Sequence, residues 1–180
     1  MKAINYLAGL LLVLLLGVSQ WAVAEGNSTY RLASGDVIRI DVFGEPDLSL
    51  DGIRLNDAGT FSYPFVGEVK ARGRTAAEIE RILADALDGD YLVGPRISIR
   101  VLEYREFFIA GEVRQPGGYR YQPGLTVRRA IALAGGLTER ASTNRITKVQ
   151  DDDEDRKPQR INLDSPVMPG DTINIDQGFF

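Results

Sequence analysis

The sequence predicts an α+β fold built from two small domains, and two observations lead to that prediction. First, a Gly-Asp turn that leads into a strand of alternating apolar and polar residues occurs at 32–42 and again, in outline, at 167–175. Second, short strands precede an amphipathic helix in each half of the chain. Glycine can take the positive φ of a tight turn, and aspartate can bond nearby backbone amides. The expected structural turn residues, which carry no chemistry by themselves, are Gly35, Asp36, Gly170 and Asp171.

Residues 1–24 differ in kind from the rest of the chain and are predicted to form a cleaved secretory signal peptide. A lysine precedes an apolar run over 7–18, which is shorter than the roughly 20 residues that cross a bilayer as a helix. Small residues close the segment, so cleavage is expected between Ala24 and Glu25. An uncleaved inner-membrane anchor is the alternative. The folded protein is therefore expected over residues 25–180.

The composition excludes several classes of function. Removal of the signal peptide leaves 20 basic and 25 acidic residues, and this acidic balance argues against nucleic-acid binding. The chain has no cysteine and no histidine, which rules out disulfides, a lipidated cysteine, zinc and copper sites and the usual nucleophilic triads. The 25 acidic residues leave a carboxylate pair for glycoside hydrolysis as an alternative, but no motif marks such a pair. We therefore expect no catalytic residue, no cofactor and no metal ion.

The first half of the folded chain reads as strands followed by a helix. Strands are expected at 37–43 and 48–55, and a turn cluster at 56–60 separates them from a third strand at 61–66. Pro64 cannot donate to a central ladder, so that third strand is expected at an edge.

The clearest helix is predicted from Thr75 to Leu87. Thr75 and Glu78 have the spacing of a capping box, and Gly89 is placed to end the helix. About thirteen residues are marginal as an isolated helix, so it is expected to pack on a sheet that includes a strand at 97–101. The apolar stripe that would face this sheet comprises Ile79, Ile82, Leu83, Ala86 and Leu87.

The pattern restarts after Glu103, where we expect the boundary between a first domain at 25–103 and a second at 104–180. A short helix is expected from Val127, closed by Gly135 and Gly136. Strands are expected at 107–113, 119–121, 146–149 and 160–163, with a charged loop at 151–158 and a last strand after the second Gly-Asp turn.

Several of these segments together resemble the outer-membrane polysaccharide biosynthesis/export family, whose best-known members form channels for capsule and exopolysaccharide. The opening strand at 30–44 (YRLASGDVIRIDVFG), the hairpin at 57–67 (DAGTFSYPFVG) and the helix from Thr75 fit the export domain. The segment at 108–119 (FIAGEVRQPGGY) with 125–137 fits the soluble-ligand-binding β-grasp (SLBB) module that follows it. The resemblance implies one export domain followed by one SLBB domain.

The role that this resemblance implies is mechanical. The chain would be a periplasmic component of a capsular or exopolysaccharide export machine, with copies joined as a ring homo-oligomer that lines a conduit. The implied partners are the polysaccharide and an inner-membrane polysaccharide copolymerase, and no catalysis is implied.

The chain departs from the full-length channel formers of this family in two ways. Those proteins carry a lipidated cysteine and end in an amphipathic helix that crosses the outer membrane, whereas here only residues 177–180 follow the last predicted strand. Four residues cannot span about 30 Å of hydrocarbon. We therefore expect a short periplasmic form that is associated with the outer membrane through a separate protein, for which a β-barrel is a candidate.

Other interpretations remain open on the sequence alone. A monomeric periplasmic module that binds a glycan or another small ligand is the main alternative, because a β-grasp domain serves either purpose. A calcium site at 151–155 is disfavoured because the spaced acidic pattern is missing, so a solvated loop is expected. Phe179 and Phe180 either dock on a partner or fray. Most other aromatics are expected in the core: Phe61, Tyr63, Phe65, Phe107, Phe108, Tyr119 and Tyr121.

Overall fold

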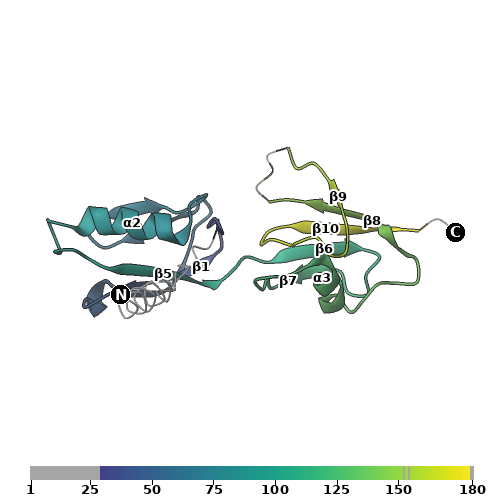
Figure 1. The fold of residues 1–180 in the computed structure, drawn as a ribbon, viewed down its shortest axis with the longest axis horizontal. Helices are drawn as coiled ribbons and strands as arrows, with labels where there is room; N and C mark the ends of the chain where they lie inside the picture. Colours follow the sequence, from purple (N-terminus) through teal and green to yellow (C-terminus); the bar gives the residue numbers. More distant parts are fainter. Residues whose placement is uncertain (1–28, 152, 154, 179–180) are drawn as a thin grey trace, which may run out of the picture.

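The structure is a computed structural model, and it describes residues 29–151, 153 and 155–178. The expected signal peptide with its cleavage site at Ala24 and Glu25, and the aromatic pair Phe179 and Phe180, lie outside the described residues. Figure 1 shows two domains arranged end to end, connected by the short segment between β5 and β6. The predicted α+β class is confirmed, because each domain combines a sheet with a helix.

The N-terminal domain is built on a three-stranded antiparallel sheet. Its strands are β1 (Val37–Val42), β2 (Leu50–Arg54) and β5 (Ile97–Glu103), in the order β2-β1-β5. A separate hairpin of β3 (Thr60–Tyr63) and β4 (Gly67–Lys70), the short 3-10 helix η1 (Pro46–Leu48) and the helix α2 (Ala76–Leu87) complete the domain. Residues of β1, β3, β4, α2 and β5 contribute to its buried core, and partly buried residues of η1 and β2 pack against that core.

The predicted capping box of α2 is confirmed. The Thr75 hydroxyl oxygen accepts a hydrogen bond from the Glu78 backbone N at 3.3 Å, and the Glu78 carboxylate accepts one from the Thr75 backbone N at 2.7 Å. The latter bond is the main cause that lowers the pKa of Glu78. Ile79, Leu83 and Leu87 are fully buried, as expected, whereas Ala86 is exposed because it lies at the margin of the stripe.

The helix is also tied directly to the sheet. Glu80 of α2 accepts a hydrogen bond from the backbone N of Ile99 in β5, at 2.7 Å. Since β5 has a strand partner on one side only, this carboxylate satisfies a backbone donor on its free edge.

The strand expected at 61–66 is shorter than predicted. β3 ends at Tyr63, and residues 64–66 form the turn into β4, with Phe65 at φ +64°. Proline lacks the N–H that a continuing ladder needs, and the left-handed backbone of Phe65 reverses the chain. As a consequence the Phe65 side chain is exposed at the tip of a hairpin instead of lying in a strand.

The C-terminal domain is a five-stranded sheet with one helix. Its elements are β6 (Phe107–Gly111), β7 (Gly117–Tyr119), α3 (Val127–Leu133), β8 (Ala141–Val149), β9 (Gln159–Ile161) and β10 (Thr172–Gln177). The strand order is β7-β6-β10-β8-β9, in which β10 is parallel to β6 and antiparallel to β8. β7 begins two residues earlier and β8 five residues earlier than the sequence pattern predicts.

A second core lies between this sheet and α3. Phe107, Ile109, Ile173 and Ile175 from the central strands are buried against Val127, Ala130 and Ile131 of the helix. Of the aromatic residues expected in the core, Phe61, Tyr63 and Phe107 are buried, whereas Phe65 and Phe108 are exposed.

None of the helices among the described residues is both long enough and apolar enough to span a bilayer.

We predict that Thr75→Ala lowers the free energy of unfolding by about 1 kcal/mol, because the substitution removes the acceptor that caps α2. Urea denaturation followed by far-UV circular dichroism measures this loss. Thr126→Ala is the matched control, since Thr126 is the N-cap residue of α3 but makes no side-chain capping hydrogen bond. An equal loss in both variants would contradict the prediction.

Candidate functional site

The two Gly-Asp turns are 135 residues apart in the sequence, yet both contact the segment that connects the two domains. The Asp36 carboxylate accepts a hydrogen bond from the backbone N of Arg105 at 3.0 Å. The backbone N of Gly170 donates to the carbonyl of Glu106 at 3.0 Å, and the carbonyl of Asp171 accepts from the backbone N of Phe108 at 2.8 Å. The segment between the domains is thus held by one turn from each domain.

The first turn encloses a buried carboxylate. Asp36 has an exposed fraction of 0%, and its Oδ2 accepts hydrogen bonds from the Tyr30 hydroxyl at 2.6 Å and from the Ala33 backbone N at 2.8 Å. Gly35 takes φ +90°, which an L side chain rarely adopts. The aspartate therefore orders both its own turn and the linker.

The second turn also encloses a buried carboxylate, that of Asp171, and here a lysine is its counterion. Oδ2 of Asp171 accepts from the Met168 backbone N at 2.8 Å and lies 3.0 Å from the Lys148 ammonium, in a buried ion pair. Gly170 takes φ +85°, and a Cβ at this position would lie 2.6 Å from Nε of Arg105. The second turn therefore requires glycine both for its backbone conformation and for its approach to Arg105.

Arg105 itself connects the two domains electrostatically. Its Nη1 donates to the Tyr30 hydroxyl at 2.9 Å and lies 3.7 Å from Oδ2 of Asp36. Its Nε lies 3.2 Å from Oδ2 of Asp151 in the C-terminal domain, as an ion pair without hydrogen-bond geometry. We call Tyr30, Asp36, Arg105, Asp151 and Gly170 the interdomain latch.

Three tyrosines continue the latch across the junction. The rings of Tyr30 and Tyr104 meet edge to face with centroids 4.9 Å apart, and those of Tyr104 and Tyr121 do so at 5.3 Å. Burial, followed by the hydrogen bond to Asp36, raises the pKa of Tyr30 far above its usual value. Burial also raises the pKa of Tyr104 and of Tyr121.

Sequence reasoning singled out the four turn residues but missed their partners. Tyr30, Arg105 and Asp151 are separated by tens of residues, so no local pattern joins them. The one available signal is a basic residue, Arg105, two positions after the expected boundary at Glu103. Asp151 lies in the expected acidic loop and is exposed, and in addition it forms the ion pair with Arg105.

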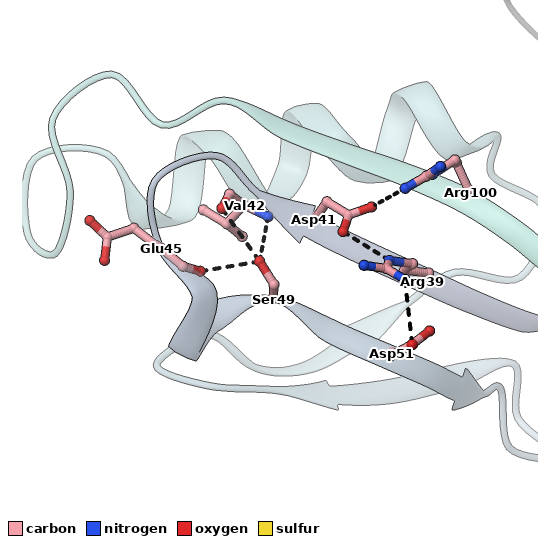
Figure 2. A network of polar contacts seen from close by, with 7 residues as sticks. All are labelled: Arg39, Asp41, Val42, Glu45, Ser49, Asp51 and Arg100. Atoms are coloured by element: carbon pink, nitrogen blue, oxygen red, sulfur yellow. Dashed lines mark hydrogen bonds and ion pairs between the residues drawn. The ribbon is translucent and has the colours of Figure 1, made fainter.

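A second polar site lies on the N-terminal domain, where a groove of about 810 Å³ follows β1 and the start of β5. Figure 2 shows the charged network in which Arg39 and Asp41 of the groove bond to two residues beside it, Arg100 and Asp51. Asp41 accepts hydrogen bonds from Nε of Arg39 at 2.9 Å and from Nη2 of Arg100 at 2.7 Å, and Arg39 also reaches Asp51 at 3.4 Å. The bonds from Arg100 and then Arg39 lower the pKa of Asp41.

The loop that forms one wall of this groove is fixed by Ser49. Its hydroxyl oxygen accepts from the Val42 backbone N at 2.9 Å and donates to the Glu45 carbonyl at 3.1 Å (Figure 2). Next to this loop, Phe43 is 75% exposed, and the Arg96 guanidinium lies 4.3 Å from its ring centroid. The groove thus presents an aromatic ring beside paired charges, an arrangement suited to binding a polar ligand.

We predict that Asp36→Ala lowers the free energy of unfolding by about 3 kcal/mol, because Tyr30, Ala33 and Arg105 each lose a buried acceptor. Urea denaturation measures the loss. The variant should also be cut faster by trypsin after Arg105, since the linker is released. Asp51→Ala removes an exposed carboxylate and serves as the control. Wild-type stability and an unchanged cleavage rate in Asp36→Ala would contradict the role of the latch.

The raised pKa of Tyr30 predicts a loss of stability at alkaline pH. The folded protein keeps the phenolic proton, whereas the unfolded chain releases it above pH about 10, so the free energy of unfolding falls as the pH rises beyond that value. Tyr30→Phe should show a smaller decline between pH about 9 and 11 in urea denaturation. Tyr91→Phe, at an exposed tyrosine, is the control. Parallel pH profiles for Tyr30→Phe and the wild type would refute the prediction.

Two family profiles match consecutive parts of the chain. Residues 24–102 match the polysaccharide biosynthesis/export protein family, and residues 107–162 match the SLBB domain. The first range holds the core that surrounds α2, and the second holds most of the core that surrounds α3.

Relatives with similar sequences are described as exopolysaccharide proteins. The chain is 29% identical over 150 residues to the exopolysaccharide production protein ExoF of Rhizobium meliloti (strain 1021), a match that covers 82% of this chain and 32% of ExoF. It is 25% identical over 145 residues to the EPS I polysaccharide export outer membrane protein EpsA of Ralstonia solanacearum, covering 67% of this chain and 38% of EpsA. The chain therefore spans about a third of the length of these curated relatives.

The order of the two matched segments agrees with the order of the two sheets. The chain therefore contains a domain of the polysaccharide biosynthesis/export protein family followed by an SLBB domain.

Proposed function

We propose that the protein is a periplasmic component of a capsular or exopolysaccharide export machine, and that its copies form a ring homo-oligomer that lines a conduit for the polymer. The observation that carries this proposal is the export domain held to an SLBB domain by the interdomain latch. The printed descriptions of ExoF and EpsA support a role in exopolysaccharide production or export. The proposal assigns no catalytic step to the chain.

A fixed relation between the domains supports the ring. A closed ring needs every subunit to present the same two surfaces at the same angle. Bonds to the backbone of Arg105, Glu106 and Phe108, together with the Arg105 ion pairs, restrict the φ and ψ angles of the linker. The linker loses this conformational freedom when the subunit folds. Ring assembly therefore does not include the entropy cost of ordering it.

The remaining features of the proposal concern location and partners. We infer that residues 1–24 are a signal peptide cleaved between Ala24 and Glu25, and that the domains are 25–103 and 104–180. The protein then resides in the periplasm, receives polymer beside an inner-membrane polysaccharide copolymerase, and associates with the outer membrane through a separate protein.

Deletion of the gene tests the proposed function. We expect the deletion strain to secrete little polysaccharide and to retain polymer in the periplasm, and expression of the wild-type chain to restore secretion. Polymer released by osmotic shock and polymer in the medium are both quantified. Sedimentation of the purified exported chain, with and without chemical cross-linking, should show a large discrete oligomer.

The rival function predicts different results from the same experiments. A monomeric module that binds a glycan or another small ligand would remain monomeric at all concentrations, bind a short oligosaccharide saturably and leave secretion intact when deleted. That combination would refute the proposal.

A further inference from the structure

We propose that the groove along β1 and the start of β5 is the surface that contacts the exported polysaccharide, with a sugar ring stacked on Phe43 and its hydroxyls bonded to the Arg39–Asp41–Arg100 network. This inference rests on the proposed export function and specifies which surface of the subunit faces the polymer.

Phe43 is an aromatic side chain held in place at the surface. It directly follows β1, its backbone N donates to the Arg96 carbonyl at 2.9 Å, and the Arg96 guanidinium lies 4.3 Å from its ring centroid. Arg96 thus covers part of the ring, yet 75% of the residue remains exposed. The face of an aromatic ring carries partial negative charge, which suits the C–H bonds on the apolar face of a sugar.

The charged network beside this ring is suited to hydroxyl groups. Each guanidinium has five N–H donors, more than the contacts of Arg39 and Arg100 use, and the Asp41 carboxylate has further lone pairs. A vicinal pair of sugar hydroxyls can both donate to the carboxylate and accept from a guanidinium. The network therefore offers matched donors and acceptors to a neutral polar ligand.

The balance of charge in the network also suits a conduit. The two basic residues that line the groove, Arg39 and Arg96, are balanced by two acidic ones, Asp41 and Glu45. The groove therefore has no strong net charge that would hold a polymer by electrostatic attraction alone. Ion pairs at this level of exposure contribute little to stability, which leaves their bonding capacity available to a ligand. Each subunit then binds the polysaccharide only weakly, and the polymer can pass from one subunit to the next.

The groove is formed before any ligand arrives. Ser49 bonds to both Val42 and Glu45 and so fixes the loop that forms its wall (Figure 2). A rigid site loses less conformational entropy on binding than a mobile one. This order explains how a shallow site can select polar polymer without deep burial.

The observations favour a glycan over a protein partner at this surface. Protein interfaces have an apolar centre depleted of charges, whereas Phe43 is surrounded by Arg39, Asp41 and Arg96. The exposed apolar pair of the same domain lies outside the groove, where the rings of Phe65 and Tyr91 stack with centroids 4.7 Å apart. Phe65 therefore provides a matched control for Phe43.

Binding to purified polymer tests this inference. The probe is the exopolysaccharide from the culture medium of the host strain, cut to oligosaccharides and titrated into the exported full chain, with chemical shifts followed by NMR. We expect Phe43→Ala to weaken binding about tenfold, because it removes the stacking contact. Arg100→Ala should weaken it measurably, and Phe65→Ala should bind like the wild type.

Three outcomes would overturn the inference. Wild-type protein that does not bind the oligosaccharides at millimolar concentrations excludes a glycan site, and unchanged affinity in Phe43→Ala and Arg100→Ala places any site elsewhere. A change in the sedimentation of Phe43→Ala with unaltered oligosaccharide affinity would instead identify the groove as a contact between copies of the chain.

Export in the deletion strain separates this inference from the proposed function. If deletion blocks secretion but Phe43→Ala and Arg100→Ala restore it as well as the wild type and bind oligosaccharide normally, the function stands and the groove inference fails. If deletion leaves secretion intact, the export function fails, and the polymer-facing groove fails with it.

Discussion

The arrangement of this protein depends on how the three-residue linker between β5 and β6 is held. Asp36 from one domain and the Gly170–Asp171 turn from the other bond to backbone groups of Arg105, Glu106 and Phe108, within a stretch of four residues. Arg105 adds charge contacts to both domains. Each domain has its own core, so the interdomain geometry rests on the ring contacts of Tyr30, Tyr104 and Tyr121 and on polar contacts. The polar contacts are strengthened by the burial of the Asp36 and Asp171 carboxylates.

Asp36 and Asp41 are only five residues apart in the sequence, but they differ in burial and in role. Asp36 is enclosed and bonded to groups that fix the fold, whereas Asp41 lies on the outer face of β1, where Arg39 and Arg100 hold it in a solvated network. The alternation of a β-strand explains part of this contrast, because neighbours of Asp41 such as Ile40 and Val42 point into the core. One short segment thus supplies both a structural acid at the junction and a polar surface on the sheet.

The features that sequence reasoning predicted correctly depend on neighbours along the chain. The capping box of Thr75 and Glu78 is set by a three-residue spacing, and the fold class follows from strand and helix periods. The hairpin tip at Phe65 was missed because Pro64 shows only that this position cannot donate to a central ladder. It does not show where the chain turns. Arg105 and Asp151 were missed because their pairing exists only once both domains are folded. The groove around Phe43 was missed for the same reason, since Arg96 directly precedes β5 and Arg100 lies in it, more than 50 residues further along the chain.

The position of β10 determines when the protein can reach its final shape. This strand, at Thr172–Gln177, lies between β6 and β8, so the C-terminal sheet is split into two unpaired halves until those residues are available. The Gly170–Asp171 turn, which bonds to the backbone of the linker and of β6, immediately precedes β10. During synthesis the N-terminal domain can therefore fold early, while the C-terminal domain stays open and the angle between the two is set in the last step.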